Sequence, residues 1–454
     1  MKHKDVIIIG GGPAGITFGN LFKKLRPEAN VAMFRPENHS MVYCVIPYAI
    51  EGLFDPSRTF KSDKLVTDAG IELLRSYVTE VDFKSKEVID STGDRYSYHK
   101  LFIATGASPV RLPLPGIDAP NVFTVKTEDD MSGIITRIKN GARRAVVIGA
   151  GAIGIEQAQA YSARGIETWL IDIAPYILPN MLDKEMVTPL NEALEQKGIH
   201  CLMERRVEGL EKTLSNISSV HLSDGYKIEL DPEIDFVCFS VGMKPDIDIF
   251  VKAGIEANGD GIVVDSKMKT NIPDVYAAGD CCTFISAIDG KPISGKLATN
   301  AVPMAKVAAR VAAGKDDEYE GFCNGAATCA GNWRVGSTGF TATFAEKRGI
   351  KTVSGYGETT TIFPMMPGSE MLKVKIVAEE KELKVIGGQV ISKLSTTDKI
   401  DIITLSIQQH MTVKELSKLS YSAQPWQSFM PARNAIVEAC EYIMNLPIRT
   451  YTKK

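Results

Sequence analysis

Residues 4–15 read KDVIIIGGGPAG, and the ten that follow, ITFGNLFKKL, continue as a helix. Four apolar residues form a short buried strand that runs directly into a glycine-rich turn. Gly10, Gly12 and Gly15 fill the three places of a G-x-G-x-x-G pattern. The first glycine permits the tight turn, the second lets backbone approach a pyrophosphate, and the third lets the helix pack on the strand. A turn placed between strand and helix predicts a dinucleotide-binding fold.

A second turn of the same kind follows the apolar strand in ARRAVVI. Gly149, Gly151 and Gly154 occupy the glycine places, and a helix and another strand follow. Asp172 ends that strand, 23 residues after Gly149, where an acid is expected to bind the adenosine ribose of NADH. Its carboxylate would repel a 2′-phosphate, and the three residues after it supply no cation. Asp172 therefore favours NADH over NADPH.

The bulk composition excludes several classes of protein. The chain has 454 residues, with 44% hydrophobic and 24% charged, which is ordinary for a globular protein of two or three domains. The formal net charge of -3 gives no sign of a nucleic-acid partner. No apolar run is long enough for a signal peptide or a membrane span. Eight scattered cysteines without a repeated C-x-x-C favour a reducing cytoplasm and no metal site.

Two further segments resemble buried strands that end in glycine. They are LFIATG, residues 101–106, and VYAAGD, residues 275–280. From about residue 321 strand-like pieces alternate with turns, and helical stretches follow around 397–410 and 431–445. We expect an α/β protein with two Rossmann-like nucleotide-binding domains and an α+β C-terminal domain. The expected boundaries are 1–113 with 251–320 for the first, 114–250 for the second and 321–454 for the third.

These segments together resemble the pyridine nucleotide-disulfide oxidoreductase superfamily over nearly the whole chain. The resemblance implies FAD in the first fold, NADH in the second and a C-terminal domain that forms a homodimer. The residues it implies for FAD are Gly10, Gly12, Pro13, Ala14, Gly15, Arg35, Val78, Ala104, Thr105, Gly106, Gly279, Asp280, Ala298 and Thr299. Those for the nicotinamide nucleotide are Gly149, Gly151, Ala152, Ile153, Gly154, Asp172 and Gly242. The family's usual ribose-binding Glu is missing, so either Glu37 substitutes for it or Arg35 lies against the adenine.

One cysteine stands alone soon after the first glycine turn. Ser40 to Cys44, SMVYC, resembles the SxxxC motif of coenzyme A-disulfide reductases, NADH oxidases and NADH peroxidases. Tyr421, in VKELSKLSYSAQPW, matches a tyrosine that reaches the other subunit's active site in that subgroup. The resemblance thus assigns Cys44, Ser40 and Tyr421 to catalysis. A thiolate beside the flavin attacks a disulfide or persulfide and forms a mixed disulfide, or it cycles as a sulfenic acid. The alternative is a buried, inert thiol.

Several residues depart from the subgroup pattern. Pro13 replaces a histidine that assists oxygen or peroxide chemistry in the oxidases and peroxidases, which argues against that activity. Met365-Met366 replaces a tyrosine pair of the coenzyme A-disulfide reductases, so a persulfide, a polysulfide or another small thiol compound fits equally well. Lys23 and Lys24 match arginines that meet coenzyme A phosphates. A solvated helix end, where cations suit the dipole, would also explain both lysines.

The leading hypothesis is a cytoplasmic FAD enzyme that passes electrons from NADH through Cys44 to a small sulfur compound. The alternatives are an NADH oxidase, a reductase of a small electron-transfer protein such as rubredoxin, and a flavin-bound sensor or scaffold. A second redox pair among Cys281, Cys282, Cys323 and Cys329 stays open. His39 and His99 are interpreted as surface or structural residues.

Overall fold

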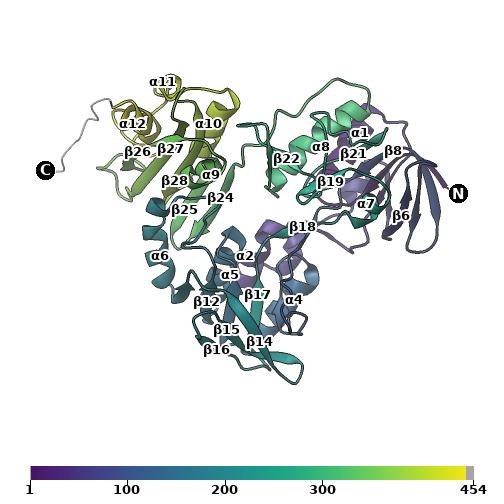
Figure 1. Cartoon of the computed structure of the whole chain (residues 1–454), viewed down its shortest axis with the longest axis horizontal. Coiled ribbons are helices and arrows are strands. Elements are labelled where there is room, and N and C mark those ends of the chain that lie inside the picture. The colour runs from purple at the N-terminus through teal and green to yellow at the C-terminus, as the bar shows by residue number, and fades with distance from the viewer. Residues whose placement is uncertain (1, 446–454) are drawn as a thin grey trace. The chain divides into compact units, whose positions relative to one another are not determined.

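The structure is a computed structural model that describes residues 2–445 and divides into two compact units (Figure 1). Unit 1 runs to Val110 and includes Lys126–Glu128 and Gly242–Phe322. Unit 2 comprises Arg111–Val125, Asp129–Val241 and the chain from Cys323 onward. None of the helices within residues 2–445 combines the length and the apolar character needed to cross a bilayer.

Unit 1 is built on a sheet of seven strands in the order β5-β2-β1-β8-β7-β6, with β21 also paired to β8. The strands are β1 (Lys2–Ile9), β2 (Val31–Phe34), β5 (Ile71–Leu74), β6 (Val78–Asp82), β7 (Glu87–Asp90), β8 (Arg95–Ile103) and β21 (Val275–Ala277). β1, β2, β5, β8 and β21 are parallel, so their carboxyl ends share one edge. Helices α1 (Pro13–Leu25) and α8 (Ala298–Ala312) pack against each other in this unit.

Short elements complete unit 1. A two-stranded ladder of β3 (Ser40–Met41) and β4 (Phe60–Lys61) flanks a 3-10 turn, Tyr43–Val45, which leads into α2 (Ile46–Glu51). The others are a 3-10 turn at Pro56–Thr59, α3 (Lys64–Thr67), β9 (Ala107–Pro109), β18 (Met243–Pro245), α7 (Asp248–Lys252), β19 (Ala257–Asn258), β20 (Gly261–Ile262), β22 (Phe284–Ile285) and β23 (Pro292–Ile293).

The first part of unit 2 is a parallel five-stranded sheet in the order β10-β17-β11-β12-β13. Its strands are β10 (Val122–Phe123), β11 (Arg144–Ile148), β12 (Glu167–Ile171), β13 (Ile199–Leu202) and β17 (Phe236–Phe239). Its helices are α4 (Glu128–Lys139), α5 (Ala152–Ala163) and α6 (Thr188–Glu195), with a 3-10 turn at Lys184–Met186. An antiparallel sheet of β14 (Val207–Thr213), β15 (Asn216–Leu222) and β16 (Lys227–Glu229) accompanies it.

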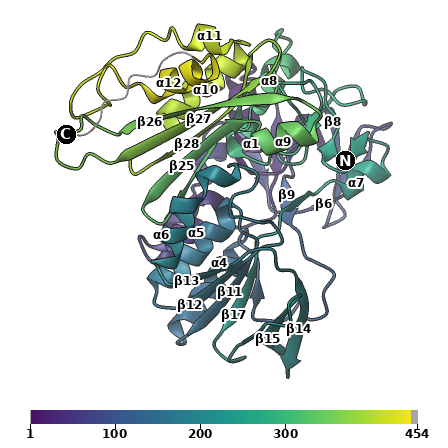
Figure 2. The same cartoon turned by 60° about the vertical axis from the view of Figure 1, so that its left-hand side comes forward.

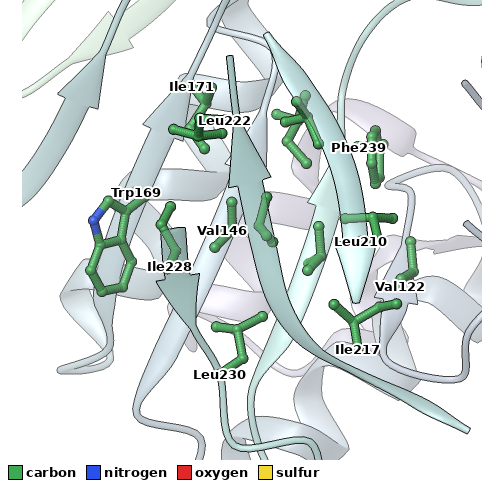
Figure 3. Packing of buried hydrophobic residues seen from close by; sticks show 14 of the residues in the cluster. Val122, Val146, Trp169, Ile171, Leu210, Ile217, Leu222, Ile228, Leu230 and Phe239 are labelled. Atoms are coloured by element: carbon green, nitrogen blue, oxygen red, sulfur yellow. The ribbon is translucent and has the colours of Figure 1, made fainter. Parts of the chain in front are cut away.

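A hydrophobic core joins these two sheets (Figure 3). Val146 and Trp169 from the parallel sheet pack in one cluster with Leu210, Leu222 and Ile228 from the antiparallel sheet. Each of these side chains is at most 8% exposed. Burial of this apolar surface fixes β11 and β12, and these strands position the second glycine turn and Asp172.

The second part of unit 2 is an antiparallel sheet in the order β24-β25-β28-β27-β26, covered by helices (Figure 2). Its elements are β24 (Ala326–Ala330), β25 (Trp333–Gly339), α9 (Ala342–Lys347), β26 (Thr352–Thr360), β27 (Met371–Glu379), β28 (Val385–Ser392), α10 (Thr397–Gln408), α11 (Val413–Leu416) and α12 (Ala435–Ile443). Gln159 Nε2 donates to the carbonyl of Cys329 at 2.8 Å, and Gln159 Oε1 accepts from the backbone N–H of Gly331 at 2.7 Å. The two parts of unit 2 are therefore joined by hydrogen bonds.

Candidate active site

The first glycine turn lies at the carboxyl edge of the unit 1 sheet. Gly10 has a φ of 112°, and a Cβ there would lie 2.1 Å from the carbonyl oxygen of Ala104. A Cβ at Gly15 would lie 2.0 Å from the carbonyl oxygen of Gly10, so helix and turn are in contact. A Cβ at Gly12 would meet no atom within 4 Å, and helix α1 has no side-chain N-cap. Open space over uncapped helix N–H groups fits a pyrophosphate.

The structure brings the two other predicted FAD segments to this turn. Ala104 follows β8, and its N–H donates to the carbonyl of Ile9 at 2.8 Å. Gly279 follows β21, and a Cβ there would lie 3.2 Å from the Cβ of Ala14 and 3.3 Å from that of Ala301. Ala301 belongs to α8, whose first two residues are the predicted Ala298 and Thr299. The residues present therefore fit a dinucleotide such as FAD at this edge. Val78 lies at the start of β6, in the same sheet.

Arg35 has a role that the sequence did not indicate. It is only 2% exposed, and its guanidinium donates to Asp63 Oδ1 at 2.5 Å and to the carbonyls of Glu37 and Asn38 at 3.3 Å. Its Cδ lies 2.4 Å from where a Cβ of Gly11 would be. Arg35 thus packs against Gly11 of the first glycine turn, and its ion pair connects this turn to Asp63. Its contact with an adenine, and the substitution of Glu37 for the missing Glu, stay predictions.

Cys44 is the one exposed thiol among the eight free cysteines, all of which lie in the described part of the chain. It occupies the middle of the 3-10 turn Tyr43–Val45, between β3 and α2. Ser40, on β3, is 4% exposed and pairs with Lys61 across the ladder. The exposure of Cys44 does not match a buried, inert thiol. An accessible sulfur in a turn is able to attack a soluble sulfur compound.

Lys61 is a charged neighbour of Cys44 that sequence reasoning missed. It is half-buried, and this burial lowers the pKa of its ammonium, while Cys44 acts on it electrostatically in the opposite direction. A cation at this position attracts anionic sulfur compounds towards Cys44. Lys61 comes near Cys44 because β3 pairs with β4. Strands of only two residues leave no pattern in the sequence from which this pairing could be predicted.

Charged side chains gather around Lys126, which lies beside Tyr43 in unit 1; most of them are half-buried, and Asp246 is exposed. The Lys126 ammonium lies 4.3 Å from the centroid of the Tyr43 ring, and burial lowers its pKa. Burial raises the pKa of the carboxyls of Asp280 and Asp246, and Lys126 counteracts this shift in both. Lys296 Nζ donates to the backbone carbonyl of Asp280 at 2.9 Å. Of these five residues only Asp280 was predicted: Tyr43 lies inside the SMVYC motif but has no assigned role there, and the other three come from segments without a motif.

The predicted substrate lysines differ in their surroundings. A hollow of about 570 Å³ is lined by Asn20, Lys23, Lys24 and Lys64, among others. Lys23 Nζ donates to the carbonyls of Pro27 at 2.6 Å and Ala29 at 2.8 Å, so Lys23 closes the loop after helix α1. Lys24 is exposed, and Asn20 Oδ1 has no hydrogen-bond partner among the described residues. Lys24 and Lys64 are therefore better placed than Lys23 to bind an anion.

The second glycine turn is held in unit 2 in the same manner as the first. Gly149 has a φ of 106°, and a Cβ at Gly154 would lie 1.8 Å from its carbonyl oxygen. Asp172 accepts from the backbone N–H of Ala150 at 2.6 Å and of Ala174 at 2.8 Å. The hydrogen bond from Ala150 thus places Asp172 directly against the second glycine turn. Gly151 is the N-cap residue of α5, Ala152 is the first residue of that helix, and Ile153 is 47% exposed.

Two predicted residues belong to a different unit from the residues they are grouped with, and both groupings stay predictions. Gly242, grouped with the second turn, belongs to unit 1, where its carbonyl accepts from the Val110 N–H at 2.9 Å. Tyr421, assigned to catalysis with Cys44, belongs to unit 2. Tyr421 is 40% exposed, and its hydroxyl donates to the carbonyl of Pro431. Its role beside Cys44 stays a prediction.

The cysteines left open by the sequence also separate. Cys281 and Cys282 are both fully buried, with their sulfurs 3.9 Å apart. Cys323 is buried at the start of the C-terminal part, while Cys329 is half-buried on β24. The thiols of Cys281 and Cys282 are therefore in contact with each other.

Comparisons with known proteins agree with this geometry. Residues 4–309 match the family model described as pyridine nucleotide-disulphide oxidoreductase, and residues 326–432 match the dimerisation domain of that family. The chain is 31% identical to an NADH oxidase of Methanocaldococcus jannaschii, over 92% of this chain and 94% of that protein. It is 30% identical to an NAD(P)H coenzyme A polysulfide/persulfide reductase of Pyrococcus horikoshii, over 91% of this chain and 92% of that protein.

A solved structure of a related enzyme has a similar fold. The NAD-dependent persulfide reductase from A. fulgidus superposes with a TM-score of 0.92 at 26% identity, covering 97% of this chain and 83% of that one. The predicted fold class and family resemblance are confirmed. The chain belongs to the pyridine nucleotide-disulphide oxidoreductase family and is an enzyme that uses FAD and a nicotinamide nucleotide.

Proposed function

We propose that this enzyme passes electrons from NADH, by way of FAD and Cys44, to a small sulfur compound such as coenzyme A persulfide, coenzyme A disulfide or a polysulfide. The observation that carries the proposal is the position of Cys44. It is an exposed thiol in a 3-10 turn of the unit that holds the FAD-type glycine turn, and Lys61 lies on the adjacent ladder.

The chemistry needs one cysteine only. FAD, when bound, takes a hydride from NADH and delivers the two electrons to sulfur. The Cys44 thiolate attacks one sulfur of coenzyme A disulfide, forms a mixed disulfide and releases one coenzyme A thiolate. With a persulfide the attack falls on the sulfur bonded to coenzyme A, and hydrosulfide leaves instead. Two electrons from NADH then break the mixed disulfide, which releases coenzyme A and regenerates the Cys44 thiolate.

Other residues of the chain bind and orient. Asp172, held by two backbone N–H groups, has lone pairs left for the adenosine ribose of NADH. Lys24 and Lys64, beside the hollow of about 570 Å³, supply positive charge for coenzyme A phosphates. The matched dimerisation domain supports a homodimer in which the exposed Tyr421 of each subunit serves the partner's site.

The relatives support this class of reaction and also name its rival. One is called a coenzyme A polysulfide/persulfide reductase and another an NADH oxidase, at nearly equal identity. Pro13, which begins helix α1 where the oxidases carry a histidine, favours the sulfur reaction. An oxidase remains the second candidate because of the 31% identical relative of that name.

The experiment is NADH consumption under strict exclusion of oxygen, with coenzyme A disulfide, coenzyme A persulfide or no acceptor. Native protein is compared with Cys44→Ser and with Cys201→Ser, a control thiol on β13 of unit 2 whose pKa burial raises to about 12. We expect turnover with one sulfur compound in the native and Cys201→Ser proteins and none in Cys44→Ser, with FAD retained in all three. NADH consumption that appears only after oxygen is admitted would support the oxidase instead, and equal activity of Cys44→Ser would refute the proposal.

A further inference from the structure

Three polar side chains meet on the surface of unit 1, on two neighbouring strands. His3 and Asp5 lie on β1 and His99 lies on β8, and one donor atom of each falls within 4.8 Å of the others. His99 Nδ1 is 3.2 Å from Asp5 Oδ1, and the rings of His3 and His99 meet edge to face with centroids 4.5 Å apart. The parallel register pairs His3 with Ser97, so Asp5 and His99 are level two residues further along.

We propose that His3, Asp5 and His99 bind a divalent transition-metal ion such as Zn²⁺. Two imidazoles and one carboxylate are ligands that these ions prefer, whereas Mg²⁺ and Ca²⁺ prefer oxygen alone. Neighbouring ligand atoms around a tetrahedral zinc ion are ~3.3 Å apart. The His99–Asp5 pair already has this spacing at 3.2 Å. The widest gap closes by a side-chain movement of roughly 1.5 Å, within the reach of exposed rotamers.

Hydrogen bonds already orient two of the three ligands. The backbone N–H of Asn30 donates to Asp5 Oδ2 at 2.7 Å, which leaves Oδ1 directed at His99. His3 Nδ1 lies 3.0 Å from Ser97 Oγ, which leaves Nε2 for a metal ion. Metal-binding histidines usually have such a partner on the second ring nitrogen, because it fixes the tautomer and the orientation of the ring.

The local charge suits a dication. One carboxylate and two neutral imidazoles carry a single negative charge. Alternation along the strands puts Lys4 and Lys100 on the opposite face from the three ligands. Their ammonium groups are engaged there, Lys4 with Asn30 Oδ1 at 3.1 Å and Lys100 with Asp274 at 3.4 Å. Neither lysine therefore competes with a metal ion for Asp5.

The position of the site indicates its effect. His3 stands near the start of β1, and the glycine turn follows the other end of this strand at Ile9. Six residues of strand span ~20 Å, so a metal ion at His3 cannot touch the reacting groups. It would join β1 to β8 and stabilise unit 1, because only the folded chain brings the three ligands together. The inference is independent of the proposed sulfur chemistry.

The test is calorimetric titration of the full-length, FAD-loaded protein with Zn²⁺. All proteins carry Cys44→Ser, which removes the exposed thiol as a competing ligand. His3→Ala, His99→Ala and Asp5→Asn each remove one ligand. His221→Ala is the matched control, since His221 is a surface histidine with Glu211 at 3.2 Å but belongs to no such three-residue cluster among the described residues.

We expect one Zn²⁺ per chain in the parent and in His221→Ala, and binding at least roughly tenfold weaker in each ligand variant. Zn²⁺ should raise the melting temperature of the parent but not of His3→Ala, and Mg²⁺ should do neither. Circular dichroism and FAD content show which variants are folded, and any one folded ligand variant suffices. Equal binding by parent and ligand variants, or no Zn²⁺ binding up to about 1 mM, would overturn the inference.

Discussion

Lys375 and Asp183 form a buried ion pair inside unit 2, with Lys375 Nζ 2.7 Å from Asp183 Oδ2 and both side chains no more than 3% exposed. Asp183 lies between β12 and α6, and Lys375 lies on β27 of the antiparallel sheet. Gln389 Nε2 donates to the same carboxylate at 2.6 Å, and the Thr343 hydroxyl donates to its other oxygen at 2.7 Å. The pair therefore joins the nucleotide-binding part of unit 2 to its C-terminal part.

Replacing Asp183 with Asn should destabilise unit 2 markedly. The substitution leaves the buried Lys375 ammonium with Glu185, which is 44% exposed, as its remaining carboxylate. Removal of one partner from a buried pair typically costs about 3 kcal/mol or more, so the thermal melting temperature should fall by several degrees. Glu382→Gln is the control, because its pair with Lys384 is about half exposed and should contribute little. A melting temperature equal to that of the control would contradict the role assigned to the pair.

The same pair should make the enzyme sensitive to acid. Burial alone would raise the pKa of Asp183, but the bonds from Lys375 and Thr343 outweigh it and lower the pKa to about 2. An aspartate in the unfolded chain has a pKa of about 3.9. The folded pKa is the lower one, so the stabilisation is complete well above pH 4 and is lost as the pH falls towards 2. Melting temperatures measured from pH 7 to pH 3 should decline less steeply in Asp183→Asn; parallel curves would contradict this.

Lys61→Met should slow the alkylation of Cys44 at neutral pH. Lys61 is half-buried and interacts electrostatically with Cys44, so its removal takes away a cation that attracts anionic reagents to this sulfur. The rate with iodoacetate, an anion that Lys61 attracts, followed from pH 5 to pH 10, should fall severalfold at pH 7. Lys61→Arg should restore the native profile, and Lys84→Met, an exposed lysine in a turn of the same unit, should leave it unchanged. Superimposable profiles for Lys61→Met and native protein would refute the assignment.

Gly12→Ala should fold but bind FAD poorly. A Cβ at Gly12 meets no protein atom within 4 Å, so the added methyl group should leave the fold intact. It would instead clash with a ligand whose pyrophosphate approaches the turn. FAD affinity, measured by cofactor release on dilution, should fall at least tenfold with little change in circular dichroism. Gly259→Ala is the control, since its Cβ also meets no atom within 4 Å and it lies outside the turn. Unchanged FAD affinity in Gly12→Ala would argue against FAD binding at the first glycine turn.

The sequence predicted those parts of the fold in which local pattern and tertiary role agree. The strand expected at residues 6–9 is the apolar half of β1, and the extra residues 2–5 are polar yet paired with β8, a contact that local pattern does not encode. The helix expected around 431–445 begins instead at Ala435, because the Asn434 side chain caps it by accepting from Ile436 and Val437. The domain boundaries stay predictions.

The residues of the candidate site likewise fall into those that a local sequence pattern predicts and those that only the folded chain reveals. Glycine turns and their strand ends carry local signals, and the structure brings Ala104 against Gly10 and Gly279 against Ala14. Lys61 and Lys126 carry none, because a lone lysine gains meaning only from the neighbours that folding brings to it. The sequence predicts His99 as a surface or structural residue, and it is exposed, but its proximity to His3 depends on the parallel pairing of strands that lie far apart in sequence.

The most direct test of the central claim is the mass of the intact chain after anaerobic incubation with coenzyme A disulfide, before and after addition of NADH. We predict a gain of one coenzyme A moiety in mixed disulfide linkage, located by peptide mapping at Cys44, absent from Cys44→Ser and removed by NADH. A chain that consumes NADH with this substrate while Cys44 stays unmodified, or a moiety on Cys44 that NADH does not remove, would contradict the account.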